Sequence, residues 1–127
     1  MAIQKPKTIL VVDDDAEILD VAAKSLRHLG HKILVAENGR HALEVVEQSG
    51  ETIDLLVTDV IMPVMNGVEL AENLAKISST TRVIFMSGYL KPSLEDQNTP
   101  DYEKGFVQKP FSTKTLASRV KEVLKNN

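Results

Sequence analysis

Residues 8–15, TILVVDDD, decide the fold, because a strand-length apolar run ends there in three consecutive aspartates. The run shows no polar alternation, which is typical of a strand buried on both faces of a mostly parallel sheet. Further short apolar runs follow at similar spacing, at residues 33–35, 53–57, 83–86 and 106–107. We therefore predict an α/β domain built on a five-stranded parallel sheet.

The segments between these runs have the periodicity of surface helices with one apolar stripe. Their expected N-caps are Asp15, Asn38, Asn66 and Ser112. Right-handed crossovers then place the helices on both sides of the sheet. Residues 89–104 are the exception, because two prolines and a polar run leave poor periodicity there, and we expect at most a short, irregular helix.

Composition excludes several classes of function. A chain of 127 residues has the size of one domain, which we expect over residues 1–127 with its core at about 7–125. The absence of cysteine excludes thiolate metal sites, thiol catalysis and disulfides. Fifteen Lys and Arg against eighteen Asp and Glu give a net charge of -3, which is unfavourable for binding the phosphates of DNA. We therefore expect no nucleic-acid partner.

The apolar run near the N-terminus has five residues before the aspartates, which is too short for a signal peptide core or a membrane-spanning helix. The lack of cysteine fits a reducing compartment. We therefore expect a cytoplasmic protein with no membrane contact of its own.

Acidic side chains directly follow the first and third predicted strands. In sheets of the flavodoxin-like order 2-1-3-4-5, an order borrowed from known folds, these strands are neighbours and ligands bind at their carboxyl ends. Asp13, Asp14 and Asp59 would then converge, and a hard divalent cation would relieve their repulsion. The alternatives are a solvated helix start for Asp13 to Asp15 and an Asx-turn for Asp59.

Two further polar residues end the fourth and fifth predicted strands at the same edge. Ser87 offers a hydroxyl and Lys109 an ammonium group, and each can contact a phosphoryl oxygen. Taken singly, Ser87 before Gly88 is typical of a turn, and Lys109 before Pro110 is typical of a solvated surface charge. Their coincidence with the aspartates predicts a site for magnesium-assisted phosphoryl transfer.

Four motifs occur in the order found in the receiver domains of two-component response regulators. They are residues 9–15, 54–63 together with Asn66-Gly67, 86–88 and 109–111. The chain resembles this family over essentially its whole length. The resemblance implies a flavodoxin-like (βα)5 domain, doubly wound, with a parallel sheet of order 2-1-3-4-5.

The resemblance also implies the roles of individual residues. Asp59 would be the phosphoacceptor, with Mg2+ as the cofactor and Mn2+ as a substitute. The expected metal-binding groups are the carboxylates of Asp14 and Asp59, the backbone carbonyl of Ile61 and, through bound water, Asp13. Ser87 and Lys109 would hold the phosphoryl oxygens, and the bond before Pro110 would be cis.

Two expectations from the same resemblance concern the lifetime and the readout of phosphorylation. Bulky side chains at Ile61 and Tyr89 would flank the site and restrict an attacking water. Ser87 and Phe106 would form the switch, with the hydroxyl moving to the phosphoryl group and the ring turning inward. The alternative for Phe106 is an ordinary residue of the strand core.

The implied partner is a sensor histidine kinase or a histidine phosphotransfer protein, whose phosphohistidine supplies the phosphoryl group. The signal would leave through the face formed by residues 89–125, to a downstream partner or to another domain of a parent chain. The sequence of residues 85–89 and 106–111 resembles receivers at the C-terminus of hybrid sensor kinases. The chain is therefore either a stand-alone protein or an excised domain of a membrane-bound kinase. We expect a monomer or a weak dimer, and a signalling domain rather than an enzyme.

Other function classes fit the sequence less well. An unphosphorylated interaction module would not need the complete set of polar residues. An aspartate-nucleophile phosphatase usually has a second acid two residues after the nucleophile, where Ile61 stands, and a dinucleotide or flavin binder would show a G-x-G-x-x-G after the first strand. His28, His31 and His41 form no plausible metal set, and we expect all three at the surface.

Overall fold

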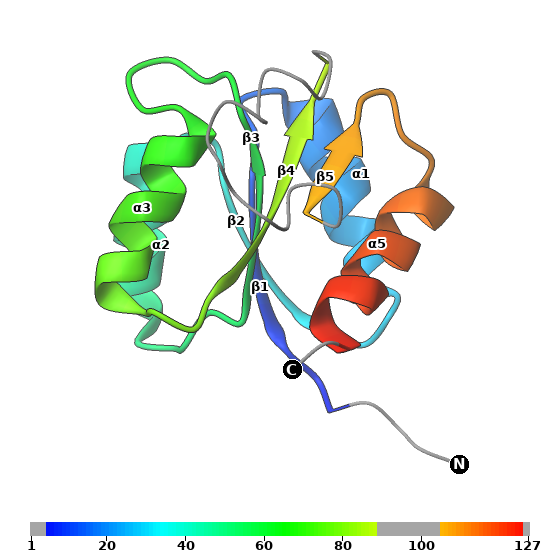
Figure 1. The fold of residues 1–127 in the computed structure, drawn as a ribbon, viewed down its shortest axis with the longest axis horizontal. Helices are drawn as coiled ribbons and strands as arrows, with labels where there is room; N and C mark the ends of the chain where they lie inside the picture. Colours follow the sequence, from blue (N-terminus) through cyan, green and yellow to red (C-terminus); the bar gives the residue numbers. More distant parts are fainter. Residues whose placement is uncertain (1–4, 89–104, 126–127) are drawn as a thin grey trace.

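The computed structural model describes residues 5–88 and 105–125, which form a parallel sheet of five strands covered by helices on both faces (Figure 1). The strands are β1 (Thr8–Val12), β2 (Lys32–Ala36), β3 (Leu55–Asp59), β4 (Arg82–Ser87) and β5 (Phe106–Gln108). The helices are α1 (Ala16–Arg27), α2 (Gly39–Ser49), α3 (Gly67–Ile77) and α5 (Thr113–Lys125). The strand order β2-β1-β3-β4-β5 confirms the predicted flavodoxin-like fold. The irregular helix expected within residues 89–104 lies outside the described residues.

The continuous apolar runs are explained by burial on both faces of the sheet. In β1, Ile9 and Val11 belong to the core shared with α1 and α5, whereas Leu10 and Val12 belong to the core shared with α2 and α3. All four side chains are fully buried. Figure 1 shows the same division, with α2 and α3 on one side of the sheet and α1 and α5 on the other. None of the described helices is long and apolar enough to cross a membrane.

The predicted helix starts are observed. Asp15 accepts hydrogen bonds from the first turn of α1, and Asn38 accepts one from the backbone of His41 at 2.7 Å. Asn66 and Glu69 form a reciprocal capping box at the start of α3. Ser112 stands just ahead of α5, and its Oγ accepts a hydrogen bond of 3.0 Å from the N–H of Thr115 in the first turn. These caps satisfy backbone donors that the helices leave unpaired.

The third strand begins and ends later in the sequence than predicted. It begins at Leu55 rather than Ile53, and Asp59 is its last residue rather than the first residue beyond it. The cause is pairing with β4, which continues to the partners Asp59 and Met86. Asp59 is therefore fixed by the sheet itself and not by a loop.

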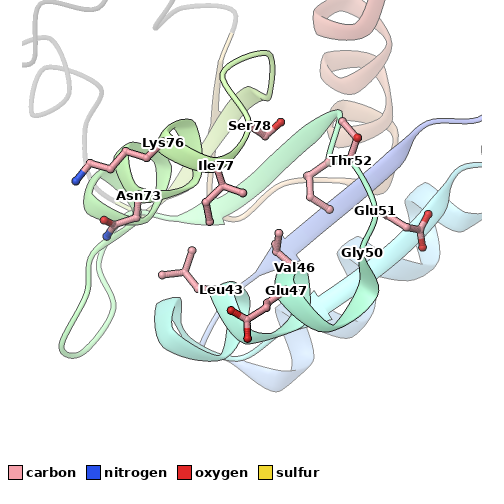
Figure 2. A pocket seen from close by; sticks show the side chains of 11 residues that line it. Leu43, Val46, Glu47, Gly50, Glu51, Thr52, Asn73, Lys76, Ile77 and Ser78 are labelled. Atoms are coloured by element: carbon pink, nitrogen blue, oxygen red, sulfur yellow. The ribbon is translucent and has the colours of Figure 1, made fainter.

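A groove of about 680 Å³ lies between the C-terminal ends of α2 and α3 (Figure 2). Leu43 and Val46 line it from α2, Ile77 from α3, and Ile53 from the segment before β3. The groove therefore lies at the edge where the strands begin, at the opposite end of the sheet from the predicted site.

His31 is buried, so the expectation that all three histidines lie at the surface is wrong for this residue. Its side chain is 8% exposed, and Nδ1 accepts a hydrogen bond of 3.0 Å from the Lys7 N–H. Burial, followed by the charge of Lys7, lowers the pKa of His31, while the charge of Asp54 opposes this shift. The neutral imidazole is the form that fits the fold, because a protonated Nδ1 cannot accept the hydrogen bond.

Acid should destabilise the protein through His31. Because the pKa of His31 in the folded state lies below 6.5, the unfolded state binds the proton more tightly, and the free energy of unfolding falls as the pH drops from 6.5 toward the lowered value. Urea denaturation between about pH 8 and about pH 5 measures this slope. His31→Asn, which keeps an acceptor, should flatten the profile, and His28→Asn, at an exposed position, should not. Parallel profiles for His31→Asn and the wild type would contradict the assignment.

Candidate functional site

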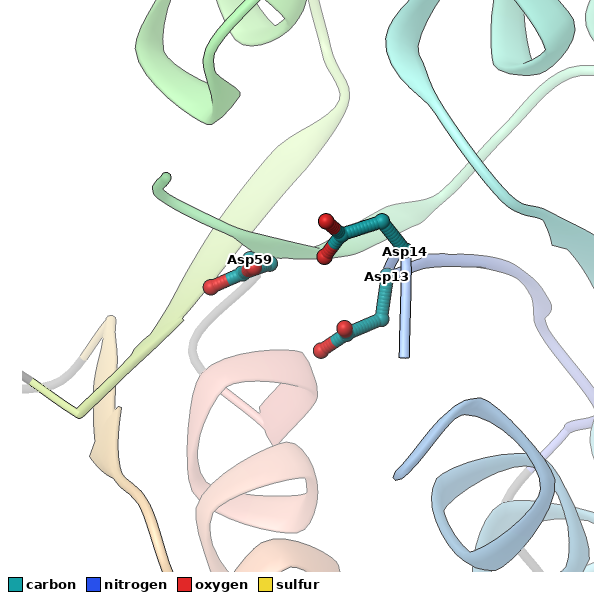
Figure 3. Close-up of side chains that lie close together, drawn as sticks. All are labelled: Asp13, Asp14 and Asp59. Atoms are coloured by element: carbon teal, nitrogen blue, oxygen red, sulfur yellow. The ribbon is translucent and has the colours of Figure 1, made fainter. Parts of the chain in front are cut away.

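Three carboxylates meet at the carboxyl edge of the sheet, where β1 and β3 end side by side (Figure 3). Asp13 and Asp14 follow β1, and Asp59 ends β3. One oxygen from each residue lies within 4.8 Å of the others. Asp13 is fully buried and Asp59 is buried, whereas Asp14 is exposed. The structure therefore brings together the acidic residues that the sequence placed at this edge.

Backbone contacts fix the two buried aspartates. Asp13 Oδ1 accepts a hydrogen bond of 2.8 Å from the Asp15 N–H, which ties the side chain to the start of α1. On the other strand, Thr58 Oγ1 donates to the Asp59 carbonyl at 3.0 Å, and the Val60 N–H donates to the Met86 carbonyl at 3.0 Å. Both carboxylates are thus held by parts of the chain that the sheet and α1 make rigid.

Lys109 joins the two buried carboxylates. Its backbone N–H donates to the Ser87 carbonyl at 2.7 Å, which places it beside the end of β4. Its Nζ lies 2.8 Å from Asp13 Oδ2 and 3.2 Å from Asp59 Oδ1. Because its side chain is 16% exposed, Lys109 is not the solvated surface charge of the plainer interpretation. The bond between Lys109 and Pro110 is cis.

The cluster holds more negative charge than positive charge. Burial, followed by the charge of Asp13, raises the pKa of Asp59, and Lys109 only partly opposes this. Burial acts to lower the pKa of Lys109, but the hydrogen bond and charge of Asp13, followed by those of Asp59, outweigh burial and raise it. The lysine therefore stays positively charged, and its single charge faces three carboxylates.

The cluster suits a hard divalent cation. Oδ2 of Asp13 is buried, and among the described residues its neighbour of opposite charge is the Lys109 ammonium at 2.8 Å, which Asp13 shares with Asp59. The cluster offers only carboxylate oxygens, which are the ligands that Mg2+ and Mn2+ prefer. A cation bound there would add positive charge beside this oxygen and reduce the repulsion among the three acids. The residues present thus fit the expected magnesium ion.

Gly67 is a requirement of the site that the sequence analysis did not identify. The first turn of α3 passes so close to the end of β3 that a Cβ on Gly67 would lie 2.2 Å from the Asp59 carbonyl oxygen. The Gly67 N–H donates to the Val60 carbonyl at 2.8 Å across the same contact. The motif Asn66-Gly67 was the available signal, but it also fits a plain helix cap. Only the position of α3 against Asp59 shows why a glycine stands there.

Gly67→Ala should destabilise the protein, because the added methyl group meets backbone that cannot move without disturbing Asp59. The expected loss in the free energy of unfolding is about 2–3 kcal/mol, measured by urea denaturation. Gly88→Ala is the matched control, since a Cβ at Gly88 would meet no atom of the described residues within 4 Å apart from those of its chain neighbours. Equal stabilities of the two variants would show that the close approach of α3 is not as described.

The loop between β3 and α3 carries a strained residue that the sequence analysis also missed. Val64 has a φ of 69° and a side chain that is fully exposed. Among the described residues, it is the only one other than glycine with a positive φ. A β-branched residue is unfavourable in this left-handed region because its Cβ approaches the following carbonyl. In the same loop Ile61 is 57% exposed.

Val64→Gly should stabilise the protein by about 0.5–1 kcal/mol, because glycine adopts a positive φ without a steric penalty, although its greater freedom in the unfolded chain offsets part of the gain. Val64→Thr keeps the branching at Cβ and should bring no gain. Thermal unfolding of both variants measures the difference. A Val64→Gly variant less stable than the wild type would contradict the strain.

Of the remaining residues named from the sequence, the structure describes Ser87 and Phe106 but not Tyr89. Ser87 ends β4 and is buried, and Phe106 starts β5 and packs with Val60 and Phe85 in a small cluster of its own. Phe106 is therefore a core residue in this state, packed against the residue that follows Asp59. Tyr89 lies outside the described residues.

Comparisons with known proteins agree with this geometry. The profile of the response regulator receiver domain family matches residues 9–121. The sensor kinase CckA of Brucella abortus (strain 2308) is 37% identical over 117 residues, which are 92% of this chain and 12% of that protein. The response regulator receiver protein CpdR of the same strain is 28% identical over 118 residues, covering 93% of this chain and 97% of that protein.

A solved structure shows the same similarity in three dimensions. The crystal structure of the receiver domain from the hybrid histidine kinase CckA superposes with a TM-score of 0.74 at 39% identity. The match covers 92% of this chain and 98% of that domain. The similarity thus extends over a whole receiver domain, although the chain spans only about an eighth of the curated sensor kinase.

Proposed function

Because the chain belongs to the response regulator receiver domain family, we propose that it serves two-component signalling by accepting a phosphoryl group on Asp59. Receiver domains are signalling modules that interact with histidine kinases or phosphotransfer proteins. The observation that carries the proposal is the Lys109 ammonium, which lies between the buried carboxylates of Asp13 and Asp59. The exposed Asp14 completes an acidic pocket that opens at the edge of the sheet.

The donor is a phosphohistidine of a sensor kinase or a phosphotransfer protein. An oxygen of the Asp59 carboxylate attacks phosphorus and forms the new P–O bond. The P–N bond breaks, and its electron pair returns to the imidazole nitrogen, which later takes a proton from solvent. Such a transfer depends on in-line positioning and on neutralising charge more than on acid or base catalysis. Lys109 is suited to this work because its Nζ already lies 3.2 Å from Asp59 Oδ1.

The same pocket would hold Mg2+, or Mn2+ in its place. The groups that would hold it are the carboxylates of Asp13, Asp14 and Asp59 and the backbone carbonyl of Ile61, with Asp13 acting through water. When bound, the ion supplies positive charge to the transferring phosphoryl oxygens. Asp59 then reacts as a carboxylate whose repulsion by Asp13 is reduced.

Readout and reset involve the residues around the pocket. Ser87 contributes its hydroxyl to a phosphoryl oxygen, and Phe106 repacks against Val60 when Asp59 is modified. Support for this comes from the packing of Phe106 in one cluster with Val60, the residue that follows Asp59 in the sequence. The change would reach a partner through the face at residues 89–125 that the family resemblance implies, of which β5 and α5 are described. Water attack at phosphorus restores Asp59, and Ile61 and Tyr89 tune its rate.

Incubation with acetyl phosphate and Mg2+ should add one phosphoryl group to the protein, detected by intact mass and lost on treatment with hydroxylamine. Asp59→Asn should abolish the adduct, and EDTA should prevent it. Asp20→Asn, which alters an exposed aspartate on α1, is the control and should react as the wild type does. No adduct on the wild type would contradict the proposal and favour an interaction module. Sustained release of phosphate from diverse esters would favour a phosphatase instead.

A further inference from the structure

We propose that Val64 is a specificity-determining contact for the protein that presents the phosphohistidine, and that this partner docks on the loop between β3 and α3. The inference deepens the proposed function and rests on it. The occupant is a folded donor protein with an apolar side chain beside its phosphohistidine.

The acceptor is recessed, so a protein donor must cover the rim of the pocket. The Asp59 side chain is 9% exposed and the Asp13 side chain is fully buried. A small reagent can enter such a recess alone. A histidine attached to a protein reaches phosphoryl-transfer distance of Asp59 only if the donor's backbone lies over the surrounding loops. In Figure 1 the green loop after β3 stands at this edge of the sheet, above the first turn of α3.

The β3–α3 loop exposes apolar side chains at the rim of the pocket, and this exposure does not stabilise the isolated domain. Among the described residues, four large hydrophobic side chains are exposed, and two of them, Ile61 and Val64, lie in this loop. The other two, Val21 and Ile77, lie on separate helices. These two apolar groups follow the phosphoacceptor by two and five residues and form a surface that association with a partner would remove from water.

Side-chain packing within the described part of the chain does not offset the backbone strain at Val64, although the Met65 N–H donates to the Pro63 carbonyl at 2.7 Å across this residue. The residue keeps a φ of 69° although its side chain is fully exposed and therefore gains nothing from packing. Strained residues of this kind concentrate at functional positions. At a contact site the left-handed turn projects the branched side chain away from the domain, and the partner supplies the missing apolar contact.

A groove beside Val64 shares Asp14 with the acidic cluster. It has a volume of about 490 Å³ and lies between the start of α2 and the β3–α3 loop. Pro63 and Val64 form an apolar wall, and Arg40 lines the groove from α2. Asp14 belongs to both the groove and the acidic cluster. A donor with its imidazole over Asp59 would therefore bring neighbouring side chains into this groove.

Phosphotransfer from a protein donor and from acetyl phosphate separates docking from chemistry. The protein donors are autophosphorylated histidine kinase cores, beginning with that of the Brucella abortus sensor kinase CckA, and the core that phosphorylates the wild type fastest is used. Val64→Asn is the test variant, because asparagine tolerates a positive φ but is polar. Ile77→Asn removes an exposed apolar side chain at the far end of the sheet and is the matched control. Thermal unfolding verifies that both variants fold.

For the protein donor, Val64→Asn should raise KM about tenfold with little change in kcat, as the loss of one apolar contact predicts. With the protein donor well below KM, the ratio of the rates with protein donor and acetyl phosphate should fall by the same factor, and Ile77→Asn should leave the ratio at the wild-type value. An unchanged ratio for Val64→Asn would overturn the inference. So would a wild type that reacts with acetyl phosphate but with none of the kinases. Failure with acetyl phosphate as well would overturn the proposed function itself.

Discussion

The ion pair that Lys109 forms with Asp13 and Asp59 is the interaction on which the rest of the site depends. Two buried carboxylates at the ends of adjacent strands repel each other, and the ammonium is the cation that the chain itself provides between them. Breaking such a buried pair by removing one partner typically costs about 3–5 kcal/mol, because a charge is left without compensation. The lysine reaches this position only because β5, a strand of three residues, pairs with β4 and ends at the same edge.

The pocket contains more negative charge than one lysine can balance. This excess destabilises the pocket by itself and favours the binding of a cation. A well-neutralised cluster would have no need of an added cation or phosphoryl oxygens. In this domain Asp13 and Asp59 share one ammonium, the pKa of Asp59 is raised, and Asp14 adds a third carboxylate to the cluster, so the negative charge exceeds the positive charge. The close passage of Gly67 holds the end of β3 in place under this repulsion. The rigid surroundings thus maintain an arrangement that would be unfavourable by itself.

Much of this architecture could be predicted from the sequence because its signals are local. Apolar runs gave the strands, and Asp15, Asn38 and Asn66 marked the helix starts through backbone hydrogen bonds within one turn. Predicting that Asp13 lies near Asp59 required a strand order borrowed from known folds. The two residues are 46 positions apart, and no local sequence pattern indicates that they are neighbours. The burial of His31, the closeness of Gly67 to Asp59 and the left-handed turn at Val64 are products of tertiary packing. No sequence pattern near these residues distinguishes them from ordinary surface or cap positions.

A magnesium titration of the isotope-labelled protein, followed by the shifts of its backbone amide resonances, tests the central claim most directly. The claim is that one oxygen-lined pocket, formed by Asp13, Asp14 and Asp59 beside Lys109, binds the divalent cation. The predicted result is a saturable shift with a single affinity, concentrated at the ends of β1, β3 and β5 and absent in Asp13→Asn. Shifts that never saturate, or that spread over the exposed acidic residues of the helices, would contradict it.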